Sequence, residues 1–464
     1  MGDVMRRLTG GLVALVLGLG LVSAGPAHAA TATRSWPVTP GALGSLYGTV
    51  DSGFSSLRIW GPAAWCYIQP TEDADVEANL ERQVAPQLDQ VADAGGSAVL
   101  TIGHPAPWVF ENHKKAVVTP KVWACGNHAS GRAIPSPASL KPNRDGTPSV
   151  QTQRYRDYVR RVVDFLAERY EGNVPITLQA WNEPNIPAGL EPGMKIPGAA
   201  HTVKEAAASL YAYDTIMYDV VREKGASDWL KVGSSTTILR WDPLTKAYLA
   251  AHNKKRRIDE IHFNLYSYDV RSVDAAVAKW DKRAGKAASV RTRYKKLRSL
   301  PIRLSEVNLN LINDPRELNL RKSFANDAAQ RRMATATQMN AYYHGIQSLY
   351  WLIPWRKIQT AVHVTTEAGN PAGDALSTLQ SHLLGTTFTG CKQARKVRTC
   401  TFRAVDGSTR LVLWRNSGTS TVRAPRSGVV AQVTGMTSPV RKGQSLRIGT
   451  TPVVIRPATT EAAG

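Results

Sequence analysis

The stretch Gln179-Ala-Trp-Asn-Glu-Pro-Asn185 decides how the rest of this 464-residue sequence is interpreted. It follows residues 174–178, Val-Pro-Ile-Thr-Leu, whose β-branched and apolar side chains are typical of a buried strand. Pro184 has no backbone N–H to donate, so it ends the strand and fixes the turn that presents Glu183. The pattern predicts a strand over residues 174–180 that carries an amide and a carboxylate at its carboxyl end.

Short apolar runs of the same kind recur along the chain and alternate with helical patterns. The runs that predict strands lie at residues 56–60, 98–102, 174–180, 230–233, 258–265, 302–305 and 348–353. Helical periodicity covers residues 75–94, 155–170, 205–224 and 327–343. An eighth strand is expected in the weak stretch 41–50. Strands that alternate with helices predict an α/β fold with a parallel sheet and helical crossovers, closed as a (β/α)8 TIM barrel.

The character of the sequence changes after about residue 384. Short alternating strands replace the helical pattern, and the turn signals between them are Asp406-Gly407, Asn416-Ser-Gly418 and Lys442-Gly443. This predicts a small C-terminal all-β domain of the β-sandwich type. The expected organisation is a signal peptide at 1–30, a loop-rich segment with the candidate first barrel strand at 31–53, the barrel at 54–384, the β-sandwich-like domain at 385–457 and a disordered tail at 458–464.

The N-terminus has the features of an export signal. Arg6 and Arg7 precede an apolar run at residues 12–22, and Ala27-His-Ala29 provides a small-x-small cleavage site. The apolar run is too short and too rich in glycine for a transmembrane span, and no second candidate follows it. We therefore expect a protein without a transmembrane segment that is secreted or associated with the cell envelope, by either the general or the twin-arginine route.

Four cysteines remain in the chain, and none of their spacings is of the C-x-x-C type that binds metals. Disulfides fit the export signal better, and four cysteines allow three connectivities. We favour Cys66 with Cys125 and Cys391 with Cys400, because each pair then stays within one predicted domain.

The formal net charge is +22, and the excess is concentrated near the C-terminus. Residues 386–464 contain 13 Lys and Arg but only two acidic residues, Asp406 and Glu461. This basic domain either contacts anionic polymers of the cell envelope or is an ordinary solvated basic surface. No nucleic-acid recognition motif accompanies the charge, so nucleic acid is not an expected partner.

A second carboxylate ends a later predicted strand, in Leu304-Ser-Glu306-Val-Asn308. The carboxyl ends of barrel strands line one pocket, so Glu183 and Glu306 are expected to meet there. Two carboxyl groups about 5–5.5 Å apart are what retaining glycoside hydrolysis needs, one as proton donor and one as nucleophile. The sequence has no P-loop, dinucleotide-binding glycines, H-E-x-x-H or G-x-S-x-G, so no cofactor and no metal are expected.

With these motifs, most of residues 54–384 resembles glycoside hydrolase clan A, in its details family 39, with family 5 as a neighbour. The resemblance implies a retaining glycosidase that acts on a carbohydrate polymer or oligosaccharide. It implies that Glu183, which follows Asn182 at the end of the fourth strand, is the acid/base. It also implies that Glu306, at the end of the seventh strand, is the nucleophile.

The resemblance further implies a set of substrate-binding and supporting residues. They are Arg58 and Trp60 in Leu57-Arg-Ile-Trp60, His104 and Trp108 in Gly103-His-Pro-Ala-Pro-Trp108, Asn182 towards the 2-hydroxyl, Asn264, Tyr266 and the platform Trp351. Four of them also have a structural interpretation. Arg58 suits a buried ion pair, His104 a packed loop, and Trp108 and Trp351 the core of a large domain.

One position departs from the family pattern. The sixth strand of the clan commonly ends His-x-Tyr, whereas this chain reads Phe263-Asn-Leu-Tyr266, so Asn264 stands where histidine is usual. His262 lies on the same strand face, one layer deeper. The sugar is therefore left open. A non-catalytic glycan-binding or envelope-binding protein on the same scaffold is the alternative hypothesis.

Overall fold

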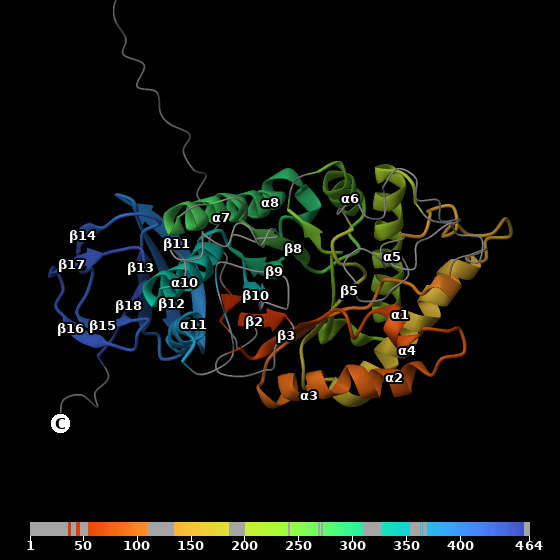
Figure 1. The fold of residues 1–464 in the computed structure, drawn as a ribbon, viewed down its shortest axis with the longest axis horizontal. Coiled ribbons are helices and arrows are strands. Elements are labelled where there is room, and N and C mark those ends of the chain that lie inside the picture. The colour runs from red at the N-terminus through yellow and green to blue at the C-terminus, as the bar shows by residue number, and fades with distance from the viewer. Residues whose placement is uncertain are drawn as a thin grey trace, which may run out of the picture. The chain divides into compact units, whose positions relative to one another are not determined.

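The computed structural model describes residues 36–38, 43–46, 54–109, 134–184, 200–239, 242–267, 270, 272–309, 326–352, 362, 364 and 369–458. Residues Thr33–Gly464 form one unit, in which a barrel is followed by antiparallel strands (Figure 1). Among the helices within these ranges, none is both long enough and apolar enough to cross a membrane.

Parallel strands form the barrel in the described part of the chain. They are β2 Leu43–Leu46, β3 Ser56–Ile59, β4 Ala98–Thr101, β5 Ile176–Gln179, β6 Leu230–Gly233, β7 Thr237–Ile238, β8 Ile261–Tyr266, β9 Ile302–Asn308 and β10 Ser348–Leu352. The order is β6-β5-β4-β3-β2-β10-β9-β8-β7. Because β6 and β7 are two pieces of the fifth strand, pairing with β5 and β8 closes the sheet. The expected first strand is β2, within residues 41–50.

Helices follow the strands, as the alternation predicts. The longer ones are α2 Val76–Gln83, α3 Ala85–Asp93, α4 Val150–Tyr170, α5 Val203–Glu223, α6 Pro243–Lys254, α7 Val273–Ala288, α10 Asp327–Tyr343 and α11 Pro371–Ser381. Side-chain caps start most of them, for example the Thr202–Glu205 capping box of α5. The single helix expected over residues 75–94 is wrong, because it breaks at Val84. In a continuous helix the ring of Pro86 would clash with the carbonyl of the residue four positions earlier.

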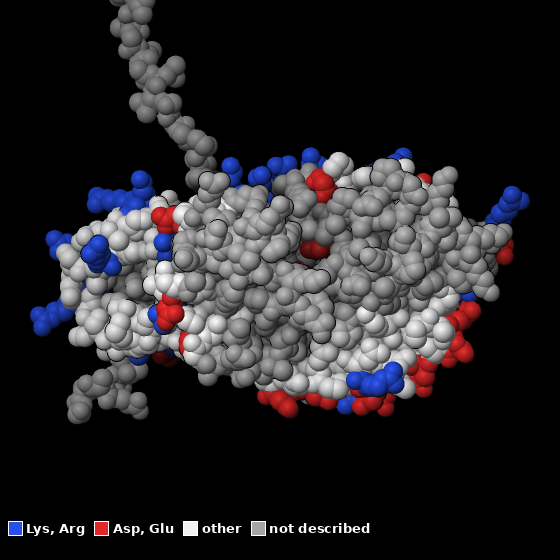
Figure 2. All heavy atoms as spheres, in the orientation of Figure 1, with Lys and Arg blue, Asp and Glu red and all other residues white. Residues whose placement is uncertain are grey.

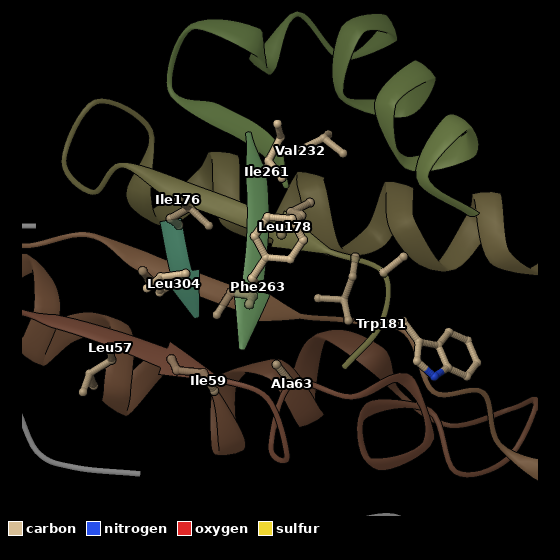
Figure 3. Packing of buried hydrophobic residues seen from close by; sticks show 14 of the residues in the cluster. Leu57, Ile59, Ala63, Ile176, Leu178, Trp181, Val232, Ile261, Phe263 and Leu304 are labelled. Carbon is tan, nitrogen blue, oxygen red and sulfur yellow. The ribbon is translucent and has the colours of Figure 1, made fainter. Parts of the chain in front are cut away.

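The barrel strands alternate between an apolar face and a polar face. Figure 3 shows apolar members of the core cluster, among them Leu57 and Ile59 on β3, Ile176 and Leu178 on β5, and Ile261 and Phe263 on β8. The same cluster includes residues of the surrounding helices α2, α4 and α5. The alternating positions hold buried polar residues such as Arg58, Gln179 and His262. Because strand side chains alternate with a period of two, these polar groups face the barrel interior.

The C-terminal strands form the expected all-β domain. The strands are β11 Thr386–Ala394, β12 Val397–Ala404, β13 Thr409–Trp414, β14 Ser420–Arg423, β15 Gly428–Gln432, β16 Thr437–Val440, β17 Ser445–Ile448 and β18 Val453–Arg456. The larger sheet has the order β1-β11-β12-β13-β18-β15-β16, and β14 pairs with β17. Its edge strand β1, Trp36–Pro37, comes from the N-terminal segment, in which the sequence shows no clear strand.

A disulfide joins Cys391 to Cys400 across the β11–β12 hairpin, as predicted. The tight turn between the strands is made by Arg395 and Lys396, which both have positive φ angles, 46° and 67°. Cys66 is also disulfide-bonded. Its predicted partner, Cys125, lies outside the described residues.

A partly buried polar cluster fixes the C-terminal sheet to the barrel. Asp281 of α7 accepts hydrogen bonds from Arg398 of β12, at 2.7 and 3.0 Å from its two guanidinium nitrogens. Asn416 donates to the same carboxylate at 2.9 Å, and His344 lies 2.8 Å from it. Burial alone would raise the pKa of Asp281, but the bonds from His344 and Arg398 outweigh it and lower that pKa to about 2. The sheet is therefore held to the barrel by ionic contacts and by a shared apolar core.

Candidate active site

The fold brings six of the predicted site residues into one cluster at the carboxyl ends of the barrel strands. They are Arg58 after the start of β3, Asn182 and Glu183 after β5, Asn264 and Tyr266 on β8, and Glu306 on β9. All six side chains are buried. In Figure 2, acidic side-chain atoms are visible at the bottom of a hollow in the face shown.

The two carboxylates are bridged by one amide. Asn264 Nδ2 donates to Glu183 Oε1 at 2.7 Å and to Glu306 Oε2 at 3.2 Å. Because both oxygens contact the same nitrogen, they can be no farther apart than the two distances together, 5.9 Å. Glu183 is 6% exposed and Glu306 is 7% exposed. Two carboxyl groups thus share one small, largely buried space.

Glu306 is held by donors on both of its oxygens. Arg58 Nη1 lies 3.2 Å from Oε2, and the Tyr266 hydroxyl donates to Oε1. The Tyr266 backbone carbonyl in turn accepts from Arg283 of α7 at 2.6 Å, which fixes the end of β8. A cationic donor and a hydroxyl donor favour the ionised form of a carboxylate, so Glu306 is presented as an anion.

Arg58 connects Glu306 to the other side of the site. Its Nη2 donates to Asn182 Oδ1 at 2.8 Å, and its Nη1 also reaches the Ser305 carbonyl at 3.4 Å. The side chain is only 1% exposed. Arg58 therefore forms a buried ion pair and also supports the candidate nucleophile, because its ion-pair partner is Glu306.

Glu183 has an unusual backbone. Its φ angle is +49°, in the left-handed region that costs a non-glycine residue about 1–2 kcal/mol. The fifth strand holds this conformation, because Glu183 N donates to Thr236 O at 2.6 Å and Thr236 N donates to Trp181 O at 2.8 Å. Strain of this kind is typical of functional sites whose surroundings over-determine the geometry. It turns the carboxylate of Glu183 towards β8.

His104 lies behind this turn. Its Nε2 accepts a hydrogen bond from the Asn182 backbone N–H at 3.2 Å. Its ring is 4.7 Å from that of Trp181 and 6.1 Å from that of Trp60. The structure therefore places His104 next to the backbone that carries Glu183, and Trp60 beside the His104 ring.

The other two predicted tryptophans have different surroundings. Trp351 on β10 is fully buried within the barrel core. Trp108 donates from Nε1 to the Gln69 carbonyl at 3.0 Å and packs edge-on against Trp65. Its described contacts join it to the segment after β3 and to Arg154, not to the carboxylate cluster. The aromatic residue type alone could not distinguish these two environments, because it suits both a sugar platform and a core.

Several polar residues of the barrel interior were not predicted as part of the site. They are Thr101, Gln179, Glu260, Arg303 and Ser305, which bond one another and Arg58 beneath the carboxylates. The available signal was their alternation with apolar residues, as in Ile176-Thr-Leu-Gln179. Within the ranges the structure describes, no group of three or more His, Cys, Asp or Glu could hold a metal ion.

No protein-family model matches the chain, and no curated protein matches its sequence. Solved structures do match its fold. A family 39 glycoside hydrolase from Bacteroides cellulosilyticus WH2 has a TM-score of 0.56 at 14% identity, covering 90% of this chain and 81% of the other. The catalytic domain of GH30 xylanase C from Talaromyces cellulolyticus has a TM-score of 0.53 at 12% identity, and the match covers 93% of this chain and 99% of the other. A glucosidase from Croceicoccus marinus has a TM-score of 0.52 at 13% identity, and the match covers 92% of this chain and 96% of the other.

These likenesses extend over nine tenths of this chain, so they include both the barrel and the C-terminal strands. Identities of this size establish the fold alone. The chain has the fold of the clan A glycoside hydrolases, a (β/α)8 barrel followed by an all-β domain.

Proposed function

We propose that the protein is a glycoside hydrolase that cleaves glycosidic bonds with retention of configuration. The observation that carries the proposal is the bridge through Asn264, which keeps Glu183 and Glu306 oxygens within 5.9 Å of each other. Retaining enzymes hold their carboxyl groups about 5–5.5 Å apart, whereas inverting enzymes need about 6.5–9.5 Å to admit a water molecule. The short separation supports double displacement.

In the first step, Glu183 donates its proton to the glycosidic oxygen while a Glu306 oxygen attacks the anomeric carbon. The bond between that carbon and the leaving oxygen breaks, and its electron pair stays with the leaving group. In the second step, Glu183 removes a proton from water, whose oxygen attacks the same carbon. The bond to Glu306 breaks, and the carboxylate is restored. Arg58 and Tyr266 hold Glu306 as an oriented anion at the start and receive it again at the end.

We infer that the substrate is a carbohydrate polymer or oligosaccharide. The groups gathered at the site are carboxylates, amides, a guanidinium and a hydroxyl, from Glu183, Glu306, Asn182, Asn264, Arg58 and Tyr266. Sugar hydroxyls both donate and accept hydrogen bonds, so they suit such a set of groups. The matched xylanase and glucosidase also act on carbohydrates, as their names state.

We further infer that the protein is exported and that its C-terminal domain contacts anionic envelope polymers. The N-terminal signal motif supports the first inference. For the second, Figure 2 shows Lys and Arg side chains gathered over β14–β17 and acidic side chains gathered over α2 and α3. Within 386–458, Asp406 is the only acidic residue against 13 Lys and Arg. Arg423 of β14, Arg447 of β17, and Arg441 and Lys442 between β16 and β17 are exposed. Such attraction weakens as salt rises.

The test is hydrolysis of a panel of aryl glycosides and cell-wall polysaccharides by the wild type and by Glu306→Gln, with the product anomer followed by proton NMR. Retained configuration, lost in the variant, is the expected result. Inverted product would refute the mechanism. Binding of a glycan without release of sugar would favour the alternative, a non-catalytic glycan-binding or envelope-binding protein on this scaffold.

A further inference from the structure

A chain of hydrogen-bonded side chains crosses the barrel interior from Arg58 to Glu260. Its six members come from β3, β4, β5 and β9, and from β8 together with the residue that precedes it. The links are Arg58 Nη2 to Thr101 Oγ1 at 3.5 Å, Thr101 to Gln179 Oε1 at 3.2 Å, Gln179 Nε2 to Ser305 Oγ at 3.1 Å, Ser305 to His262 Nδ1 at 2.7 Å, and His262 Nε2 to Glu260 Oε2 at 3.2 Å. All six residues are buried.

The direction of the last link follows from charge. Burial would raise the pKa of Glu260, but Arg303 and His262 outweigh burial and lower that pKa to about 2, so Glu260 is an ionised acceptor. Burial lowers the pKa of His262, which favours the neutral ring. A neutral ring has one donor and one acceptor nitrogen. Nε2–H must then donate to Glu260, and Nδ1 must accept from the Ser305 hydroxyl.

The remaining links follow in turn. The Ser305 hydroxyl donates its one hydrogen to His262, so its oxygen accepts from the Gln179 amide nitrogen. That fixes the orientation of the Gln179 amide, whose oxygen accepts from the Thr101 hydroxyl. Thr101 Oγ1 accepts in turn from Arg58. Every donor in the chain therefore points from the cation Arg58 towards the anion Glu260.

Packing keeps the His262 ring in this place. A Cβ atom on Gly233 would lie 2.8 Å from both Cδ2 and Nε2 of the ring, so the ring occupies space that only glycine leaves open. The His262 backbone N–H donates to Ser234 Oγ at 2.9 Å. The charged groups that face the ring in the described part of the barrel are Glu260 just before β8, Arg303 on β9 and Arg58 on β3.

We propose that His262 is a positioning residue for the nucleophile, acting through Ser305, Gln179 and Thr101 on Arg58. The role rests on the proposed glycosidase function of Glu306. Arg58 uses one nitrogen for this chain and the other for Glu306, so the chain sets the plane of the guanidinium group. With the Nε2–H tautomer in place, both Glu306 and Asn182 receive their donors. With the opposite tautomer, Ser305 and then Gln179 would have to reverse their hydrogen bonds.

The far end of the chain opens at the opposite end of the barrel. Thr177, Glu260 and Arg303 lie at or near the starts of their strands and line a pocket of about 340 Å³. Glu183 and Glu306 lie at or beyond the ends of theirs. The five hydrogen bonds of the chain therefore extend through the barrel interior, from the pocket at the amino-terminal face to Arg58 beside the carboxylates.

The first experiment measures the tautomer without any substrate. Nitrogen-15 NMR of the histidine rings in the full chain is expected to show His262 protonated at Nε2 and not at Nδ1, with a pKa below that of a free histidine. In Ser305→Ala, the Nδ1 resonance is expected to move to the position of a nitrogen without a hydrogen bond. A ring protonated at Nδ1, or one that titrates like a free histidine, would overturn the proposal.

The second experiment measures kcat and KM of Ser305→Ala and His262→Gln on the best substrate of the panel. We expect kcat to fall about tenfold with KM nearly unchanged, because small misplacements of a catalytic group can cost up to about 10²-fold. The matched control is His344→Gln, which removes a histidine–aspartate pair at the sheet interface and should lower stability without lowering kcat. If both test variants behave like this control, the role is refuted. If the wild type releases no sugar at all, the proposed function fails and this role fails with it.

Discussion

The side-chain nitrogen of Asn264 lies 2.7 Å from Glu183 Oε1 and 3.2 Å from Glu306 Oε2, so an uncharged amide joins the two carboxylates of the site. We expect Asn264→Asp to lower kcat/KM and to move the alkaline limb of its pH profile upward by about one unit, because a third carboxylate favours protonation of its neighbours. The pH dependence of kcat/KM measures this. Asn264→Ala is the control for the lost hydrogen bonds. An unshifted profile in the aspartate variant would contradict the bridging geometry.

Glu183→Ala tests the acid/base. We expect kcat/KM on substrates with poor leaving groups to fall about 10²–10⁴-fold, because such leaving groups need protonation. Activated aryl glycosides, which leave without a proton, should lose much less in the first step. Added azide should restore turnover and yield a glycosyl azide of retained configuration. Equal losses on both substrate types would argue against an acid role for Glu183.

Asp281 tests the junction between barrel and sheet. Its pKa of about 2 in the folded state lies below its ordinary value of 3.8, so its ionised form stabilises the fold above about pH 4. This contribution, about 2 kcal/mol, is lost as pH falls from about 4 towards 2. Urea unfolding of Asp281→Asn should show a stability lower by about that amount at neutral pH and a weaker loss in acid. Asp157→Asn, on an exposed face of α4, is the control. If the free energy of unfolding fell equally with decreasing pH in the wild type and in Asp281→Asn, the lowered pKa of Asp281 would be refuted.

The turn of the disulfide hairpin tests backbone strain. Lys396 has a φ angle of +67°, which glycine adopts freely and lysine does not. We expect Lys396→Gly to raise the free energy of unfolding by about 0.5–1 kcal/mol, since relief of strain exceeds the added freedom of the unfolded chain. Gly407→Ala is the mirror experiment, because Gly407 has a φ of +78° with open space around it. It should destabilise by a similar amount, as thermal unfolding would show. A stabilised Gly407→Ala would refute the strain argument.

The strand ends of the barrel could be predicted because local patterns specify them. Trp181-Asn-Glu-Pro184 ends a strand by its own chemistry, and Asn264 and Tyr266 share a face because strands repeat every two residues. The resemblance assigned Arg58 to the site, and the structure shows its ion pair with Glu306. The roles of these residues stay predictions until the variants above are measured.

Other features depend on partners that a local pattern does not reveal. Gln179 donates a hydrogen bond to Ser305, which lies 126 residues later in the chain, so the sequence around either residue does not predict the contact. His104 accepts from a backbone N–H, which no side-chain motif encodes. Trp108 donates a hydrogen bond to the Gln69 carbonyl, although a tryptophan at this position suited a sugar platform equally well. The predicted helix over residues 75–94 failed because the apolar period continued through a proline that the backbone cannot accommodate.

Trp36 pairs with Phe388, 352 residues later in the chain, and their rings lie 4.2 Å apart. A contact with such a long sequence separation forms late, since loop-closure entropy opposes it until the intervening chain is ordered. The edge of the C-terminal sheet therefore cannot be completed on a growing chain until about four fifths of it has been synthesised. The β1–β11 pairing joins the chain segment that precedes the barrel to the segment that follows it. Folding should thus finish in one cooperative step that brings these two segments together.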